Sequence, residues 1–255
     1  MSKARIVTAE YGMHSDKVAA PVRLLVVSDL HNARYGEGQA RLLAAVDAAR
    51  PDAVLLTGDL FHKNGPEENT RQFLRLIGTR YPCYFVTGNH EQRTGHADAL
   101  RAFAADCGIT VLCGGAETFT AENGQSIQLL GVDWQRTYRE ASGELADAAA
   151  LRDPALFSVI LVHAPDHRVQ VLSHGFDLMV SGHAHGGQWR IPGVLNGVFA
   201  PGQGLFPQYA GGLYDVAGGK LAVSRGLGKK PALIPRFFNP PEITLVTVSP
   251  ALSPD

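Results

Sequence analysis

The sequence predicts an α/β fold in which the strands of a largely parallel sheet alternate with helices. Five apolar runs have the length of buried strands and lead into polar residues, at positions 22–27, 53–56, 84–86, 158–162 and 176–180. Asp29 and Asp59 are 30 residues apart, and so are Asp59 and Asn89, which is roughly the length of one strand–helix–strand unit. The polar residues after these strands should therefore meet at one edge of a sheet, where open α/β proteins bind ligands.

Two helices are predicted within the first part of the chain, behind an edge strand at residues 4–11. Residues 39–49 carry apolar side chains at helical spacing, and Pro51 ends that pattern. Residues 67–77 repeat the pattern. Both have the character of crossover helices of a parallel sheet, and the alternation continues to about residue 108.

The later half of the chain changes character. Residues 109–133 predict a hairpin around Asn123-Gly124, and residues 186–240 are rich in Gly and Pro with little periodicity. Long loops of this kind in a compact enzyme usually shape a substrate pocket. Two closing strands are predicted at 219–224 and 243–248, and we expect one domain over residues 1–255 with a mixed core.

Composition limits the classes of function. The chain has 255 residues, 45% of them hydrophobic, and a formal net charge of −1, which gives no general attraction to nucleic acid or to an anionic membrane. Its three cysteines form no CxxC or zinc pattern and are read as reduced thiols. The first twenty residues contain charged side chains throughout, so we expect no signal peptide, no membrane span and a cytoplasmic location.

Oxygen and nitrogen donors follow the predicted strands in an order that makes two overlapping ligand sets. They are Asp29, His31, Asp59, Asn89, His163, His183 and His185. Asp59, with two carboxylate oxygens, is the natural bridge between the sets. Carboxylate and imidazole ligands without thiolate suit manganese, iron or zinc better than calcium, and of the three we favour manganese.

Two divalent ions at this position would attract a phosphate group and stabilise the negative charge that develops during attack. They would also lower the pKa of a bound water from 15.7 to roughly 7, so that hydroxide serves as the nucleophile. The sequence contains no Gly-x-Ser-x-Gly elbow, which argues against a hydrolase with a serine nucleophile. It also contains no GxxxxGK[ST] phosphate loop, which argues against an enzyme driven by nucleotide hydrolysis.

The same motifs together resemble the calcineurin-like metallophosphoesterase superfamily, in matching order and over nearly the whole chain. The resemblance rests on Asp29-Leu30-His31, Gly58-Asp59, Gly88-Asn89-His90-Glu91, His163 and Gly182-His183-Ala184-His185. It implies a four-layer α-β-β-α sandwich of two mixed sheets. It also implies one metal on Asp29, His31, Asp59 and His185, a second on Asp59, Asn89, His163 and His183, and His90 as a non-ligand stabiliser or general acid.

Four segments resemble a narrower bacterial branch, which includes membrane-associated UDP-diacylglucosamine hydrolases and cell-envelope phosphodiesterases. They are residues 183–188, Tyr209-Ala210-Gly211-Gly212-Leu213-Tyr214, Ser224-Arg225-Gly226-Leu227-Gly228 and Phe238-Asn239-Pro240-Pro241-Glu242-Ile243. A second resemblance concerns His62, in Gly58-Asp59-Leu60-Phe61-His62. Phosphomonoesterases of the protein-phosphatase type usually have Asp at this place, whereas the double-strand-break repair nucleases of the superfamily have His. We therefore take His62 as a second catalytic residue, which favours phosphodiester cleavage.

Two further groups of side chains suggest substrate contacts. Arg225, Lys229, Lys230 and Arg236 could hold a diphosphate or nucleotide, or could be scattered charges of a solvated loop. An apolar group could line an acyl or base pocket, or could belong to the core: Phe199, Leu205, Phe206, Tyr209, Leu233, Phe237 and Phe238. The remaining histidines belong to no motif and are expected at the surface or at helix ends, namely His14, His96, His167 and His174.

The favoured function is a dinuclear metal-dependent phosphodiesterase that acts on a small nucleotide-linked or lipid-linked substrate, with peripheral membrane contact as an option. A DNA or RNA nuclease is one alternative, against which the near-neutral charge and the missing basic stripe argue. A phosphomonoesterase is a second alternative. A non-enzymatic scaffold is a third, disfavoured because every motif residue is present. The sequence leaves the substrate and the oligomeric state open.

Overall fold

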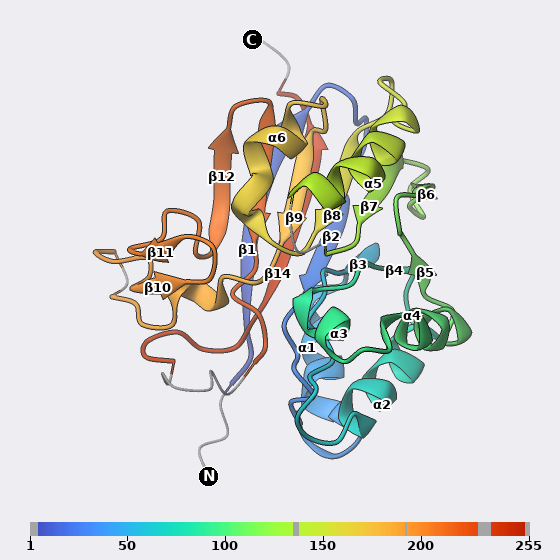
Figure 1. Cartoon of the computed structure of the whole chain (residues 1–255). Helices are drawn as coiled ribbons and strands as arrows, with labels where there is room; N and C mark the ends of the chain where they lie inside the picture. Colours follow the sequence, from blue (N-terminus) through green and yellow to red (C-terminus); the bar gives the residue numbers. More distant parts are fainter. Residues whose placement is uncertain (1–4, 135–137, 192, 229–235, 253–255) are drawn as a thin grey trace.

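The computed structural model describes residues 5–134, 138–191, 193–228 and 236–252. Two six-stranded mixed sheets form its centre (Figure 1). The first sheet has the order β1 (Val7–Ser15), β14 (Glu242–Pro250), β2 (Val22–Val27), β3 (Ala53–Leu56), β4 (Cys83–Phe85) and β5 (Thr110–Val111). The second has the order β12 (Gly212–Val216), β13 (Gly219–Val223), β9 (Leu178–Ser181), β8 (Ser158–Val162), β7 (Ser126–Val132) and β6 (Ala116–Thr120).

Both sheets combine parallel and antiparallel pairs. Strands β2 to β5 are parallel, while β14 runs antiparallel to β2 and parallel to the edge strand β1. In the second sheet, β7, β8, β9 and β13 are parallel, and the hairpin strands β6 and β12 are antiparallel to their neighbours. The predicted hairpin is confirmed, because β6 and β7 pair in antiparallel fashion. The first strand was predicted too early in the sequence: β1 begins at Val7 and continues to Ser15.

The sheets face each other across a buried apolar layer. Side chains such as Leu24 and Leu55 from the first sheet and Ile127 and Val159 from the second belong to this layer. The alternating side chains of each sheet point the other way and are covered by helices. The result is the four-layer arrangement of helix, sheet, sheet and helix that the resemblance implied.

The helices divide between the two outer faces. The first sheet is covered by α1 (Ala40–Ala49), α2 (Glu68–Ile77) and α4 (Ala97–Asp106), which contribute Leu42, Phe73 and Leu100 to one core. The second sheet is covered by α5 (Tyr138–Ala150) and α6 (Arg168–Leu172). The α1 boundary matches its prediction: Arg50 adopts a left-handed conformation with φ 46°, and Pro51 cannot continue the helix.

Several short elements lie in the loops that connect the main strands and helices. They are η1 (Glu37–Gln39), α3 (Asn89–Arg93), η2 (Pro165–His167), η3 (His185–Gly187) and the two-stranded ribbon of β10 (Phe199–Ala200) and β11 (Gly204–Leu205). The ribbon projects from the side of the sandwich near β1 and β12 (Figure 1). Among the described residues, no helix has the length and apolar character that crossing a membrane requires.

Candidate metal centre

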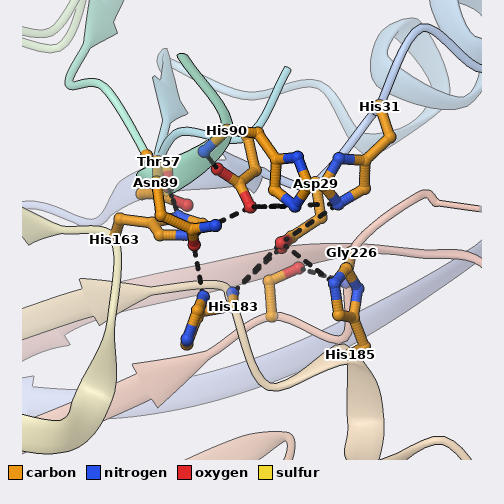
Figure 2. A network of polar contacts seen from close by, with 12 residues as sticks. Asp29, His31, Thr57, Asn89, His90, His163, His183, His185 and Gly226 are labelled. Carbon is orange, nitrogen blue, oxygen red and sulfur yellow. Dashed lines mark hydrogen bonds and ion pairs between the residues drawn. The ribbon is translucent and has the colours of Figure 1, made fainter. Parts of the chain in front are cut away.

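The predicted ligands meet at the ends of strands from both sheets. Asp29, Asp59 and Asn89 follow β2, β3 and β4 of the first sheet, and His163 and His183 follow β8 and β9 of the second. His31 and His185 lie two residues beyond Asp29 and His183. The side chains converge on one volume between the sheets (Figure 2). The edge-of-sheet prediction therefore holds, and the site uses two sheets instead of one.

The main chain is strained at these positions. Five candidate ligands have left-handed backbone angles, with φ between 48° and 66°: Asp29, His31, Asp59, His183 and His185. Residues other than glycine rarely adopt this conformation, which persists only where the surrounding structure enforces it. The sharp reversal directly after each strand points the carboxylate or imidazole back toward the centre.

The first donor set surrounds Asp29. Its Oδ1 atom lies 3.7 Å from Nε2 of His185 and 3.8 Å from Nε2 of His31. The same His31 nitrogen is 3.9 Å from Oδ2 of Asp59. The backbone nitrogen of His183 donates to the Asp29 carboxylate at 3.1 Å and 3.2 Å, which fixes its orientation. Two carboxylates and two imidazoles thus face a common point.

The second donor set surrounds His163. Its Nε2 lies 3.2 Å from Oδ2 of Asp59, 3.2 Å from Oδ1 of Asn89 and 3.1 Å from Nδ1 of His183. Its other ring nitrogen, Nδ1, donates to the main-chain oxygen of Thr57 at 2.8 Å. In the neutral ring, Nε2 is therefore an acceptor and faces three other acceptors.

That gathering of acceptors fits a cation. Without metal, the protonated His163 supplies positive charge among these groups. Once Nε2 of His163 loses its proton, four lone pairs face one point, and mixed carboxylate, amide and imidazole donors suit a divalent transition metal there. Asp59 belongs to both groups, since its Oδ2 faces His163 on one side and His31 on the other. The donor chemistry of the described residues is therefore compatible with two ions that share Asp59.

In the metal-free site, burial and the negative charges of Asp29 and Asp59 determine the pKa values of the histidines. Burial lowers the pKa of His31, His183 and His185 to about 4, so these imidazoles are neutral at physiological pH. Burial also acts on His163, but the charge of Asp59 and its hydrogen bond outweigh this and raise the pKa of His163 to about 10. In turn, His163 holds the pKa of Asp59 below its ordinary value despite burial.

His90 and His62 lie beside the donor sets as a stacked pair. Their ring centroids are 4.5 Å apart with an interplanar angle of 25°, and the His90 ring meets the edge of His31 at 4.6 Å. Nδ1 of His62 lies 3.0 Å from the backbone nitrogen and 3.3 Å from the main-chain oxygen of Asn64, and these contacts position the ring. Burial lowers the pKa of His90 to about 4, so His90 is a neutral hydrogen-bond donor.

The predicted substrate-binding cations have different surroundings. Arg225 pairs with the fully buried Glu242, at 2.6 Å between Nη1 and Oε2. Arg236 reaches the centre: its Nη2 is 3.4 Å from Nδ1 of His185 and donates to the main-chain oxygen of Arg225 at 2.6 Å. Lys229 and Lys230 lie outside the described residues. A substrate contact stays a prediction for each of them.

Two groups that shape the centre have no role predicted from the sequence. Glu91 on α3 is fully buried, and its carboxylate accepts from the backbone nitrogens of Asp59, Gly88 and Phe61, each at 2.8 Å. It ties the loops after β3 and β4 together. Gly88 itself is required there, because a Cβ at this position would lie 2.3 Å from Oδ1 of Asp59.

A second such group is the loop after β13. A Cβ on Gly228 would lie 2.9 Å from Cδ2 of His31 and 3.2 Å from the main-chain oxygen of Asp29, so the loop backbone forms a wall against the first donor set. Tyr35 holds this loop in place, because its hydroxyl donates to the main-chain oxygen of Leu227. The glycines around Leu227 were visible in the sequence, but nothing in it indicated which strand end they would contact.

Comparison with known proteins gives consistent matches. A family model for calcineurin-like phosphoesterases matches residues 22–187. The chain is 28% identical over 238 residues to phosphodiesterase YaeI of Escherichia coli, covering 89% of this chain and 82% of that protein. It is 26% identical over 235 residues to the uncharacterized metallophosphoesterase YkuE of Bacillus subtilis, covering 89% of this chain and 78% of that protein.

Solved structures share the fold at low sequence identity. Phosphopantetheinyl hydrolase from Mycobacterium tuberculosis superimposes with a TM-score of 0.53 at 13% identity, over 81% of this chain and 89% of that one. NAD nucleotidase from Haemophilus influenzae gives a TM-score of 0.51 at 15% identity, over 80% of this chain and 44% of that one. These likenesses bear on the architecture alone.

Proposed function

The chain belongs to the calcineurin-like phosphoesterase family and hydrolyses phosphoester bonds with divalent metal, and from this premise we propose a phosphodiesterase with two metal ions. The observation that carries the proposal is the position of Asp59. One of its oxygens faces His163 at 3.2 Å and His31 at 3.9 Å, so a single carboxylate lies between two donor sets. A carboxylate in this position can serve as a ligand to both members of a pair of closely spaced ions.

The ligand assignment follows from the two donor sets. Asp29, His31, Asp59 and His185 would hold one ion, and Asp59, Asn89, His163 and His183 the other. Manganese, iron or zinc suits these donors, with manganese our first choice. When bound, the ions supply positive charge for the phosphate and activate a water molecule near neutral pH.

His90 and His62 are proposed to act on the phosphate itself. His90 is a neutral hydrogen-bond donor because burial lowers its pKa to about 4, and the His62 ring stacks on it with the centroids 4.5 Å apart. Neutral donors suit a phosphodiester, which carries one negative charge and has no proton to exchange. They would stabilise the charge that develops on the phosphate oxygens as the bond to the leaving group breaks.

The substrate is proposed to be small. The net charge of −1 offers no broad attraction for a duplex, which disfavours the nuclease alternative. The Escherichia coli relative is named a phosphodiesterase, which supports the preference for diesters over monoesters. A nucleotide-linked or lipid-linked diester is therefore the class that we propose.

A metal-reconstituted assay tests this function. Manganese, iron, zinc and magnesium are added in turn, and turnover of bis(p-nitrophenyl) phosphate is compared with that of p-nitrophenyl phosphate. We expect the wild type to prefer the diester. The ratio of diester to monoester turnover should fall by about tenfold in His62→Asp, because an aspartate beside His90 holds that imidazole protonated and a cationic donor favours the dianionic monoester.

His174→Asp is the matched control, since His174 is exposed at the end of α6, away from the donor sets. It should keep the wild-type ratio. A monoester preference in the wild type that His62→Asp leaves unchanged would make the protein a phosphomonoesterase and remove the role of His62. Salt-sensitive nicking of DNA by the pure protein would revive the nuclease alternative.

A further inference from the structure

The ring of His185 has a cation behind it. Nε2 of His185 faces Oδ1 of Asp29 at 3.7 Å and therefore points into the first donor set (Figure 2). The other ring nitrogen, Nδ1, lies 3.4 Å from Nη2 of Arg236. A guanidinium has N–H donors and no acceptor, and it keeps its positive charge in proteins. The imidazole of His185 therefore lies between the candidate metal site and a fixed positive charge.

His163 shows the arrangement that a histidine ligand usually has. Its Nδ1 donates to the main-chain oxygen of Thr57 at 2.8 Å, while Nε2 faces the second donor set. A neutral imidazole that binds a metal through one nitrogen carries its hydrogen on the other, so an acceptor behind the ring stabilises the metal-bound form. At His185 a donor occupies the corresponding position. The hydrogen on Nδ1 of a metal-bound His185 would point at the N–H groups of Arg236.

Main-chain oxygens hold Arg236 in this position. Nη1 donates to the oxygen of Gly226 at 3.0 Å, and Nη2 donates to that of Arg225 at 2.6 Å. The loop that supplies these oxygens packs against the first donor set, since a Cβ on Gly226 would lie 2.6 Å from Cβ of Asp29. The guanidinium cannot turn away from His185 without breaking these hydrogen bonds.

The chain at Arg236 turns its charged side chain inward and its aromatic side chains outward. Phe237 and Phe238 are 58% and 63% exposed, whereas Arg236 is partly buried. The hydrophobic effect favours the opposite arrangement, so the polar contacts of Arg236 account for its inward position. Core packing does not explain the exposed apolar side chains of this region, which are Phe199, Leu205, Phe206, Phe237 and Phe238. Leu233 lies outside the described residues.

The cation behind His185 opposes an ion at the first donor set in two ways. It repels the positive charge of the ion, and it disfavours the form of the ring that has a free lone pair on Nε2. The main-chain oxygen of Thr57 has the reverse effect at His163, in the second donor set. Partners of this kind typically change metal affinity by about 10- to 100-fold. The two donor sets should therefore bind metal with different strengths.

We propose that Arg236 holds the first donor set at low metal affinity, so that the second donor set fills first and the first ion stays exchangeable. This inference rests on the two ligand sets proposed above. It makes Arg236 a positioning residue that acts through His185, which differs from the substrate contact predicted from the sequence. The concentration of divalent metal then determines whether the centre holds one ion or two, and so regulates turnover.

Calorimetric titration of the metal-free protein with Mn²⁺ tests the inference. The wild type should take up two ions in two resolved steps, of which the second is about tenfold weaker or more. In Arg236→Gln the weaker step should tighten by about tenfold, because a neutral side chain replaces the cation, and the stronger step should be unchanged. A purely structural role predicts the opposite sign, since a loosened loop would weaken metal binding.

Two variants serve as controls for the loss of an arginine. In the described part of the chain, the guanidinium of Arg190 donates to the main-chain and side-chain oxygens of Asn196, at 3.1 Å and 3.2 Å, and to no candidate ligand. Arg190→Gln should therefore keep both wild-type affinities. Arg236→Lys retains the positive charge and should keep the two steps apart.

Removal of the ring identifies the site of the weaker step. His185→Ala should lose that step and keep the stronger one. In this background Arg236→Gln should change nothing, because the group through which Arg236 acts is gone. A weaker step that Arg236→Gln leaves unchanged or loosens overturns the inference. An equal gain at both steps also overturns it, because the effect is then one of general charge.

Turnover of bis(p-nitrophenyl) phosphate separates this inference from the proposed function. Two ions of equal affinity, together with turnover of the diester, would overturn the role of Arg236 and leave the phosphodiesterase function supported. Unequal steps that respond to Arg236→Gln, in a protein that cleaves no diester, would refute the phosphodiesterase function and leave the role of Arg236 supported. Uptake of a single ion by the wild type would overturn both.

Discussion

Nδ1 of His163 donates a hydrogen bond to the main-chain oxygen of Thr57 at 2.8 Å. His163 follows β8 of the second sheet, and Thr57 follows β3 of the first, so this bond joins the two sheets at the metal centre. It also fixes the tautomer of the neutral ring, in which Nε2 faces Oδ2 of Asp59 at 3.2 Å. The ligand role proposed for His163 therefore depends on the packing of one sheet against the other.

Metal uptake should become stronger as the pH rises, because His163 must lose a proton before it binds a cation. Asp59 outweighs the effect of burial and raises the pKa of His163 to about 10 in the metal-free protein, whereas burial lowers the pKa of His31, His183 and His185 to about 4. Of these four histidines, only His163 has a proton to release near neutral pH. The apparent Kd for Mn²⁺ should fall about tenfold per pH unit, measured by calorimetry at about pH 7 and pH 8. A Kd that is constant over this interval would contradict the assignment.

Glu91→Gln should destabilise the protein by about 2 kcal/mol, because an amide nitrogen replaces an acceptor that holds buried backbone donors. Urea unfolding of the metal-free protein measures the change. Glu68→Gln is the control: Glu68 pairs with Arg75 at the surface, where its side chain is 68% exposed. That variant should stay within about 0.5 kcal/mol of the wild type. Equal stability of both variants would show that Glu91 does not organise the loops.

Gly228→Ala should weaken metal binding at the first donor set. The new Cβ would lie 2.9 Å from Cδ2 of His31, so the imidazole must move away. After dialysis against limiting Mn²⁺, we expect atomic spectroscopy to count about one ion per chain in this variant and about two in the wild type. Gly115→Ala, where a Cβ meets nothing within 4 Å, should retain the full metal content. Equal metal content in the two variants would mean that the loop does not support His31.

Arg225→Gln distinguishes a structural cation from a substrate contact. Arg225 pairs with Glu242, whose side chain is 0% exposed, so its removal leaves a buried carboxylate unpaired. We expect a loss of about 3 kcal/mol in the free energy of unfolding. Lys220→Gln removes a pair with Asp215, whose side chain is 89% exposed, and should cost little. A higher KM for bis(p-nitrophenyl) phosphate at unchanged stability would instead restore the substrate-binding prediction for Arg225.

The sequence could predict most of the layout because the relevant signals are local. Apolar runs mark the strands, helical spacing marks α1 and α2, and a polar residue directly after a strand marks the binding edge. The α/β architecture and the convergence of the candidate ligands were predicted on this basis. The assignment of each residue to one ion, and the single-domain organisation of residues 1–255, stay predictions.

Contacts between distant segments could not be predicted in this way. Nothing local to Gly228 indicates that it lies against His31, which is 197 residues away in the sequence. The exposure of Phe206 and Phe238 could not be predicted either. The sequence pattern of an apolar residue in an irregular segment is the same whether its side chain is covered or exposed. Only the packing of the loops decides between those outcomes.

The most direct test of two ions sharing Asp59 is to measure metal content and diester turnover together, in the wild type and in Asp59→Asn. We expect about two ions per wild-type chain, with turnover of bis(p-nitrophenyl) phosphate. In Asp59→Asn both should be lost while circular dichroism is unchanged, and Asp47→Asn, at a surface pair with Arg80, should match the wild type. Full turnover in Asp59→Asn, or in wild type freed of metal by a chelator, would contradict the account.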